Sequence, residues 1–374
     1  MSSQKTILLA TRPLIPPWDE ASKNFAYFLA KSVTKHRLTV FTTPAVLPAL
    51  PTTVTQDPCY TGGHLDFNQK LRLLNALRKH RNHFDITHYL FTPTRRNTSM
   101  IKFLSRPTRG KTIQTIATLR EDLYKGSEFK ELFFADHLVV YSDYSKMRLE
   151  KLGFDNISRI YPGIDLDLYR PKGKDVNAMR LFGIGDDDFV VMYPGEYMRL
   201  GATDMLAEWL IGYYGKNPDS NMKFVFACRI KHDDDAVKKN EIKRRFEQSG
   251  ILHHILFTDT YGDMPTLYSL ADVVVFPVND MRGKFDVPLV IIEAYACGKP
   301  VILSDLPIFG EFSGSEFCVT IPRGSTTDLE EQLAYLKGNK DARDHLSRNA
   351  RTFVEQNFDL KKTVEEYELL YESL

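Results

Sequence analysis

Residues 284–305, with the sequence KFDVPLVIIEAYACGKPVILSD, decide the fold of this 374-residue chain. Asp286 and Pro288 form a helix-start signal, because proline lacks the amide hydrogen that the first turn of a helix leaves without a partner. A mostly apolar helix follows and carries one carboxylate, Glu293, before Gly298 ends it and a short strand begins. The stretch therefore predicts a helix between two buried strands of an α/β domain.

The start of this helix is a candidate anion site. It follows a strand at residues 273–277, and the free amides and dipole of a helix both favour an anion at its N-terminus. The amides of Leu289 and Val290 would then face a phosphate, and Glu293 would accept hydrogen bonds from the hydroxyls of a ribose. A nucleoside diphosphate fits this pattern, although similar helices also occur in doubly wound domains that bind no nucleotide.

The length of the chain predicts two domains, and its composition is that of a globular protein without a run of about 18 apolar residues. The N-terminal sequence, MSSQKTILLA, passes into a strand-like run without the pattern of a signal peptide. Four scattered cysteines give neither a metal-ligand spacing nor a redox pair: Cys59, Cys228, Cys297 and Cys318. We expect a cytoplasmic protein, either free or peripheral to a membrane.

The formal net charge of +1 conceals an asymmetry between the two halves of the chain. Residues 1–165 carry 24 Lys and Arg against 14 Asp and Glu, whereas residues 166–374 carry 25 against 34. The basic excess is concentrated between Lys70 and Lys111. A solvated charged face explains this pattern without any function. The functional alternative is an N-terminal domain that meets a lipid headgroup, a phosphorylated acceptor or RNA.

Short apolar runs alternate with helical patterns, which is typical of βαβ units and a parallel sheet. In the first half we predict strands at residues 6–10, 38–42, 86–90, 111–116 and 137–142, and helices at 21–35, 68–80 and 145–152. A Pro- and Gly-containing linker follows, and the pattern restarts at residue 189. We therefore predict an N-terminal Rossmann-like domain at 1–165 and a second one at 166–356, facing each other across a central cleft. The last residues, 357–374, read as a helix that packs back on the first domain.

Four blocks in one order resemble the family-4 glycosyltransferases, which are retaining GT-B enzymes that use nucleotide sugars without an obligatory metal. The blocks are IPPWDEASKNFAYFLA at 15–30, YPGIDLDLYRP at 161–171, YPGEYMRLG at 193–201, and residues 263–305. The last block is the most specific. The resemblance spans essentially the whole chain and implies the GT-B fold, with an N-terminal acceptor-binding domain and a C-terminal domain that binds the nucleotide sugar.

The resemblance implies roles at the donor sugar that this chain only partly keeps. Glu293 holds the position of the carboxylate that binds the ribose hydroxyls. Phe285 stands where the family has a second glutamate, which contacts the donor sugar. Asp286 would either supply the lost acceptor or cap the following helix, and capping is the favoured alternative.

The same resemblance implies that cations neutralise the diphosphate leaving group. Our candidates are Arg199, Arg229 and Lys231, because the planar fork of an arginine suits a phosphate. Arg199 could equally be an ordinary surface residue; this alternative is weaker for Arg229 and Lys231, which directly follow an apolar strand. Thr258 begins a segment, 258–261, that the resemblance assigns to the nucleotide base, mainly through backbone contacts.

In the N-terminal domain the resemblance places a phosphate-facing turn at residues 19–21. The amide of Ala21 could serve there, with Lys23 adding positive charge. The family's active-site histidine aligns with Ala117, which is a second departure. His88 occupies a frequent family position facing the cleft, and a structural histidine is an equally good interpretation.

The resemblance implies a retaining transferase that moves a hexose from a UDP- or GDP-sugar to an acceptor, with Asp286, His88, Arg229 and Lys231 as its catalytic candidates and no required metal. The acceptor is unknown; an anionic lipid, glycan or phosphorylated molecule would suit the basic N-terminal domain. Two alternatives stay open. The departures at Phe285 and Ala117 would suit a non-catalytic GT-B nucleotide-binding or scaffold protein, and the basic run would suit an RNA-modifying sugar transferase.

Overall fold

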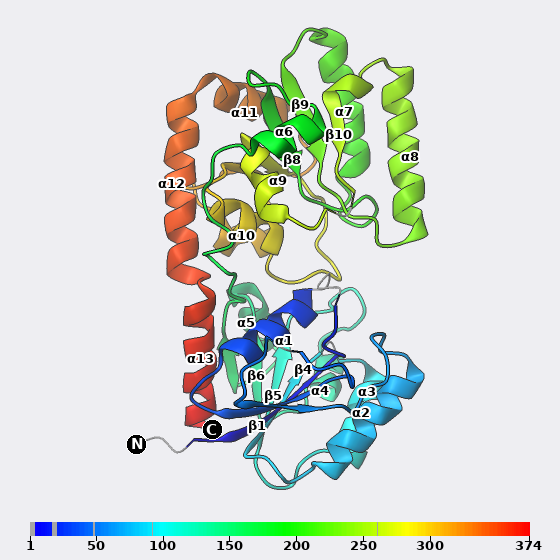
Figure 1. The fold of residues 1–374 in the computed structure, drawn as a ribbon, viewed down its shortest axis with the longest axis vertical. Coiled ribbons are helices and arrows are strands. Elements are labelled where there is room, and N and C mark those ends of the chain that lie inside the picture. The colour runs from blue at the N-terminus through cyan, green and yellow to red at the C-terminus, as the bar shows by residue number, and fades with distance from the viewer. Residues whose placement is uncertain (1–3, 17–20, 48, 92, 260) are drawn as a thin grey trace. The chain divides into compact units, whose positions relative to one another are not determined.

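The computed structural model describes residues 4–16, 21–47, 49–91, 93–259 and 261–374 (Figure 1). The chain forms two compact units, each described here by itself. Unit 1 comprises Met1–Gly163, Arg282–Val287 and Leu360–Leu374, and unit 2 comprises Ile164–Met281 and Pro288–Asp359. The first division falls two residues before the predicted boundary at 165/166. The predicted second domain is not continuous, however, because a six-residue segment in its middle belongs to unit 1.

Unit 1 is built on a seven-stranded sheet in which all paired strands are parallel, in the order β3-β2-β1-β4-β5-β6-β7. Its strands are β1 (Thr6–Thr11), β2 (Arg37–Phe41), β3 (Val54–Asp57), β4 (Ile86–Leu90), β5 (Lys111–Ile116), β6 (His137–Val140) and β7 (Ile157–Arg159). The central strands are almost entirely buried, as expected of a parallel sheet with helices on both faces. This confirms the predicted α/β class for unit 1.

Three of the six helices that the structure describes in unit 1 begin after a residue whose side chain caps them. Asp66 and Thr94 accept hydrogen bonds from the amides of Gln69 and Asn97, and so satisfy amides that the first turn leaves without a partner. The helices are α1 (Ala21–Ser32), α2 (Phe67–Lys79), α3 (Arg95–Leu104), α4 (Glu128–Leu132), α5 (Asp143–Glu150) and α13 (Leu360–Ser373).

The C-terminal helix α13 completes unit 1. Its buried Glu368 accepts hydrogen bonds from the amides of Thr34 and Lys35, at 2.8 and 2.9 Å, just beyond the end of α1. Gly163 lies so close to the start of α13 that a Cβ there would be 2.4 Å from the Cα of Leu360. A glycine is therefore needed where the linker passes the helix.

Unit 2 has a six-stranded parallel sheet in the order β10-β9-β8-β11-β12-β13. Its strands are β8 (Phe189–Tyr193), β9 (Met222–Phe226), β10 (Ile255–Phe257), β11 (Val273–Phe276), β12 (Val301–Ser304) and β13 (Val319–Ile321). Its α-helices are α6 (Val176–Phe182), α7 (Thr203–Lys216), α8 (Asp233–Gln248), α9 (Met264–Leu270), α10 (Leu289–Ala296), α11 (Thr326–Gly338) and α12 (Lys340–Asn357), with 3₁₀ turns at Leu252–His254 and Pro307–Phe312.

The strand order of unit 2 reverses between β8 and β11, and in open α/β sheets ligands bind at the carboxyl ends of strands beside such a reversal. The loops that leave these two strands are tied together at that point. The amide of Asn279 donates to the carbonyl of Leu200 at 2.9 Å, and its side chain donates to the carbonyl of Gly201 at 2.8 Å. The topology thus locates a candidate site in unit 2.

No helix in the described part of the chain is long and apolar enough to span a membrane.

Candidate functional site

Glu293, the predicted ribose-binding carboxylate, lies on α10, the helix that follows β11 at the strand reversal of unit 2. Pro288 is the N-cap of this helix and Cys297 its C-cap, and Gly298 follows with a left-handed φ of 66°. Glu293 is half-buried, and its carboxyl lies 3.2 Å from the hydroxyl of Tyr268. That hydroxyl also donates to the carbonyl of Val290 at 2.8 Å. Because a hydroxyl has one hydrogen, Glu293 keeps hydrogen-bonding capacity for a further partner.

Burial raises the pKa of Glu293 to about 7. The hydroxyls of Tyr268 and Tyr169 oppose this shift, because hydrogen bonds to the charged form favour it. Glu293 therefore changes its charge near neutral pH. A carboxyl of this kind can accept hydrogen bonds from a sugar diol once it is ionised.

The N-terminus of α10 presents two amides. The carbonyl of Pro288 accepts from the amides of Ile291 and Ile292 at 2.8 and 3.3 Å. The amides of Leu289 and Val290, in contrast, have no backbone acceptor among the described residues. They are the two amides that the sequence assigned to a phosphate, and that role stays a prediction.

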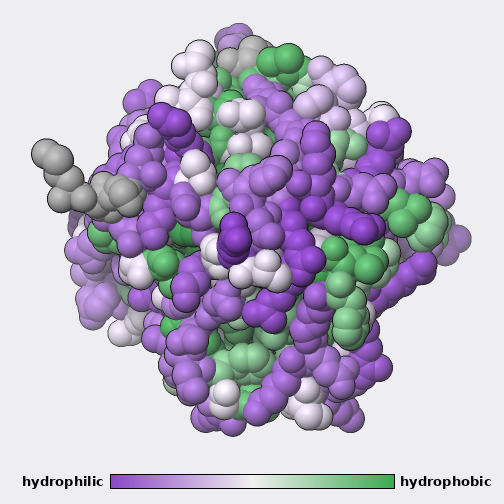
Figure 2. Space-filling model, turned by 90° about the horizontal axis from the view of Figure 1, so that it is seen from below, coloured by the Kyte–Doolittle hydropathy of each residue, from purple (hydrophilic) through white to green (hydrophobic). Residues whose placement is uncertain are grey.

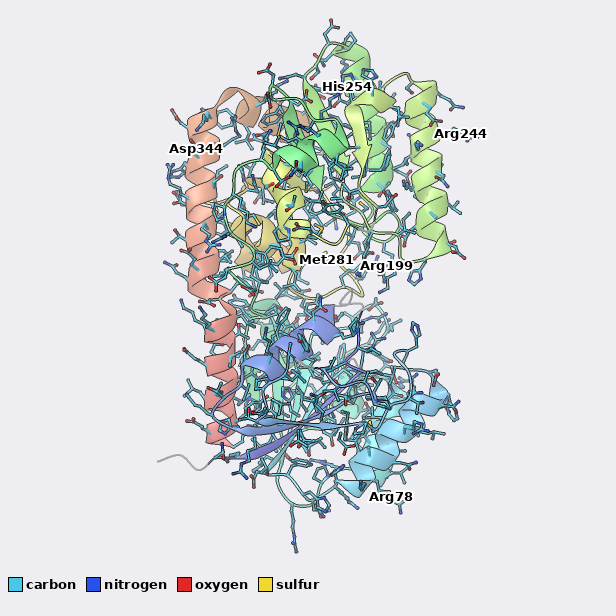
Figure 3. All side chains as sticks on the ribbon, viewed as in Figure 1. Arg78, Arg199, Arg244, His254, Met281 and Asp344 are labelled. Carbon is cyan, nitrogen blue, oxygen red and sulfur yellow. The ribbon has the colours of Figure 1, made fainter. Side chains whose placement is uncertain are left out.

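The three candidate cations lie in the loops that follow β8 and β9, at the same edge of the unit 2 sheet, but their surroundings differ. Arg199, in the loop after β8 (Figure 3), pairs with Glu196, with 3.1 Å between Nε and Oε2. Arg229 is half-buried and Lys231 is exposed, and both follow β9. An exposed ion pair of this kind contributes at most about 1 kcal/mol, so a phosphate could displace Glu196 from Arg199.

Two buried hydroxyls in this part of unit 2 have no hydrogen-bond partner among the described residues. They are the hydroxyls of Thr258, directly after β10, and of Tyr197, in the loop after β8. Asp259, the next residue after Thr258, has a left-handed φ of 50°, which is uncommon for a residue other than glycine. Buried hydroxyls normally have partners, so a ligand or water is expected to reach them.

Asp286 belongs to unit 1, and the structure corrects its predicted role as the cap of α10. Its carboxylate is 3% exposed and accepts hydrogen bonds from the amide of Leu119, at 3.0 and 3.2 Å, and from the hydroxyl of Ser145, at 2.6 Å. It does not cap α10, where the N-cap residue makes no side-chain hydrogen bond. The residue fastens the segment Arg282–Val287 to unit 1, and its contact with a donor sugar stays a prediction.

The two family departures lie beside this contact, within unit 1. The carbonyl of Ala117 accepts a hydrogen bond of 3.0 Å from the amide of Asp286. The half-buried ring of Phe285 packs on Tyr141, with 5.3 Å between ring centroids. Both positions therefore help to hold the Arg282–Val287 segment.

The structure also corrects the catalytic role of His88. The side chain is 0% exposed, and its ring nitrogens contact the hydroxyls of Tyr371 at 2.8 Å and Thr115 at 2.7 Å. The ring stacks on Tyr367 of α13, and burial lowers the pKa of His88 to about 3. His88 is a neutral structural residue beneath the C-terminal helix.

The predicted phosphate-facing turn of unit 1 is only partly described. Residues 19 and 20 lie outside the described residues, and of Ala21 the structure gives only that α1 begins there. Lys23 is a half-buried residue of α1. The roles of Ala21 and Lys23 stay predictions.

Sequence reasoning missed the tyrosines around Glu293 and the buried hydroxyl of Tyr197. Tyr169, Tyr197 and Tyr268 all lie in blocks that carried the family resemblance. No local signal shows that Tyr169 and Tyr268 converge on Glu293. No group of three or more His, Cys, Asp or Glu suited to a metal occurs in the part of the chain that the structure describes.

Comparisons with known proteins point to one class of enzyme. Residues 215–353 match the family model of glycosyl transferases group 1. The chain is 28% identical over 243 residues to a D-inositol 3-phosphate glycosyltransferase of Saccharomonospora viridis, covering 62% of this chain and 54% of the relative. A protein of the same name from Mycolicibacterium smegmatis is 27% identical over 174 residues, or 45% of this chain and 37% of that protein. The chain spans about half the length, or less, of these relatives.

Solved structures resemble the whole chain. HepE of Anabaena, in complex with UDP and glucose, has a TM-score of 0.76 at 15% identity and covers all of both chains. Sucrose-phosphate synthase of Thermosynechococcus elongatus has a TM-score of 0.77 at 17% identity, covering 99% of each chain. At such low identity the likeness concerns the fold. The chain therefore has the GT-B fold that the sequence predicted.

Proposed function

We propose that this chain is a retaining glycosyltransferase that moves a hexose from a UDP- or GDP-sugar to an acceptor and requires no metal. One observation carries the proposal: the region that matches glycosyl transferases group 1 contains Arg229, Lys231, Thr258 and Glu293. The titratable carboxyl of Glu293, the buried hydroxyl of Thr258 and the nearby cations lie on neighbouring elements of unit 2. Such a set offers acceptors for a ribose and positive charge for a diphosphate.

In this reaction the bond between the anomeric carbon and the phosphate oxygen breaks, and a bond from that carbon to the acceptor oxygen forms on the same face. The leaving phosphate takes the proton of the acceptor. Negative charge grows on the phosphate in the transition state, so stabilisation by Arg229, Lys231, Arg199 and the amides of Leu289 and Val290 is the largest contribution, on the order of several kcal/mol. The chemistry proposed here uses neither His88 nor Asp286.

The acceptor proposed for the enzyme is an anionic molecule. The N-terminal residues 1–165 carry a charge balance of 24 basic against 14 acidic residues, which favours an acceptor with a phosphate or another negative group. The names of the relatives from Saccharomonospora viridis and Mycolicibacterium smegmatis specify an inositol phosphate. A phosphorylated acceptor is therefore the first class to assay.

The first experiment is a thermal-shift panel with UDP, GDP, ADP and their common sugars. A ligand at a hundred times its dissociation constant stabilises a protein by about 2.7 kcal/mol. We expect one nucleotide to stabilise the wild type and the Glu316→Ala control, an exposed carboxylate of unit 2, but not Glu293→Ala. Turnover of that nucleotide's sugar should then fail in Arg229→Ala and Lys231→Ala. Absence of any nucleotide-dependent shift would contradict the proposal.

A further inference from the structure

The outer face of α2 and α3 combines exposed apolar side chains with a dense positive charge. Phe67 is 55% exposed, Leu71 37%, Phe103 82% and Leu104 47%. The chain has 24 phenylalanines, all within the described residues, and only Phe67 and Phe103 are exposed. Figure 2, seen from below, shows apolar residues among hydrophilic ones on the surface. Single exposed apolar residues are ordinary on a protein surface, whereas exposed apolar residues gathered on one face mark an interaction site.

These side chains belong to one surface. Phe67 and Leu71 are four residues apart on α2, and Arg96 and Phe103 are seven apart on α3, so each pair shares a helix face. The guanidinium of Arg96 lies over the ring of Phe67, 5.3 Å from its centroid, and joins the beginnings of the two helices. Near their ends, Arg81 donates a hydrogen bond to the carbonyl of Arg106. We call this surface the α2–α3 face.

The charge of this face is almost entirely of one sign. From Phe67 to Arg109 the sequence has ten Lys and Arg against one acidic residue, Asp85. Arg95 and Arg106 pair with acidic residues of unit 1. The exposed Lys70, Arg78 and Lys79 of α2 have no ion pair among the described residues, and Arg78 extends outward from its helix (Figure 3). Their charge is therefore available to an anionic partner.

We propose that the α2–α3 face docks this protein on a membrane surface that contains anionic lipids. A membrane surface with anionic lipids binds this mixture of side chains well. The apolar side chains enter the boundary between headgroups and acyl chains, while the cations remain among the anionic headgroups. RNA would satisfy the cations, and bases could stack on the phenyl rings, but it would leave Leu71 and Leu104 in water. The presence of both leucines favours the lipid surface. This inference is independent of the proposed function.

The test measures co-sedimentation of the full chain with vesicles of phosphatidylcholine, with or without phosphatidylglycerol. We expect binding only to the anionic vesicles and weaker binding at high salt. Each cation near such a surface raises the partition coefficient onto the vesicles by a factor of about five. Arg78→Glu with Lys79→Glu should therefore weaken partitioning by about 30-fold or more. Phe103→Ser should weaken it by about tenfold through lost burial.

Two matched variants in unit 2 serve as controls. Lys243→Glu with Arg244→Glu makes the same charge change on α8, and Leu181→Ser removes a 68% exposed apolar side chain from α6. Both should bind vesicles like the wild type, and all variants should keep its thermal unfolding temperature. Equal binding to neutral vesicles, no binding, or equal loss in the controls would overturn the proposal. The proposal would also be overturned if the Arg78 and Lys79 substitutions weakened the binding of polyuridylate and left the binding to vesicles unchanged.

Discussion

The hydroxyl of Ser145 donates a hydrogen bond of 2.6 Å to the carboxylate of Asp286, across 141 residues of sequence. The same carboxylate accepts from the amide of Leu119, and the amide of Asp286 donates to Ala117. The segment Arg282–Val287 is thereby fastened within unit 1 by a buried carboxyl group. Because a buried polar group needs its hydrogen bonds, the contact is expected to matter for stability.

Replacing Asp286 should therefore destabilise the fold. Asp286→Ala leaves the Leu119 amide and the Ser145 hydroxyl without their acceptor in a buried setting, at a cost of about 2–3 kcal/mol. Ser145→Ala removes one of the bonds and should cost about 1–2 kcal/mol. Chemical or thermal unfolding measures both. An Asp286→Ala protein as stable as the wild type would show that the contact contributes nothing.

Nucleotide affinity should rise with pH through the titration of Glu293. The pKa of Glu293 is raised to about 7, so the carboxyl is mostly protonated at pH 6 and mostly ionised at pH 8. A ribose diol donates to the ionised form, so the dissociation constant should fall by up to about tenfold over this range.

Calorimetric titration at the two pH values gives this change, with Glu293→Gln as the control that retains the titration of the nucleotide phosphate. An identical pH dependence in both proteins would show that the titration of Glu293 does not control nucleotide affinity. For stability the sign is opposite. The folded pKa exceeds the unfolded one, so this carboxyl makes the protein less stable as pH rises from about 4.5 to about 7.

Thr258→Val should separate stability from binding. The buried hydroxyl has no partner among the described residues, so replacing it with a methyl group should leave stability unchanged or raise it by about 1 kcal/mol. If a ligand uses the hydroxyl, the same change should weaken nucleotide binding by about fivefold. Thermal unfolding with and without nucleotide reports both effects. A loss of stability without nucleotide would mean that the hydroxyl has a partner in the folded protein.

Acid should weaken unit 1 through His88. Its pKa is lowered from 6.5 to about 3, so the stability that neutral His88 contributes is present above pH 6.5 and is lost as pH falls toward 3. At pH 5 the loss should be about 2 kcal/mol. Urea unfolding between pH 7 and pH 5 should show a smaller decline for His88→Gln than for the wild type. His83→Gln, which changes an exposed histidine, should keep the full decline.

Local signals predicted much of the fold. Pro288 and Gly298 marked the limits of α10 to within a residue or two, because missing amide hydrogens and left-handed backbone act on neighbouring residues. Apolar runs gave the buried strands of both sheets. The short or polar elements β3, α3, α4, α6 and β13 were not predicted, because three to ten residues without clear periodicity carry little local signal.

The sequence by itself determined the α/β class, the helix that carries Glu293, and the position of the cations after β8 and β9. Only the tertiary structure decided how these residues are used. Tyr371 covers His88 from 283 residues away, and Asp286 binds Ser145 instead of capping its own helix. Helix limits and strand periods follow from neighbouring residues. A side chain's partners follow from which distant segments the folded chain packs together, and burial then sets the pKa of groups such as Glu293.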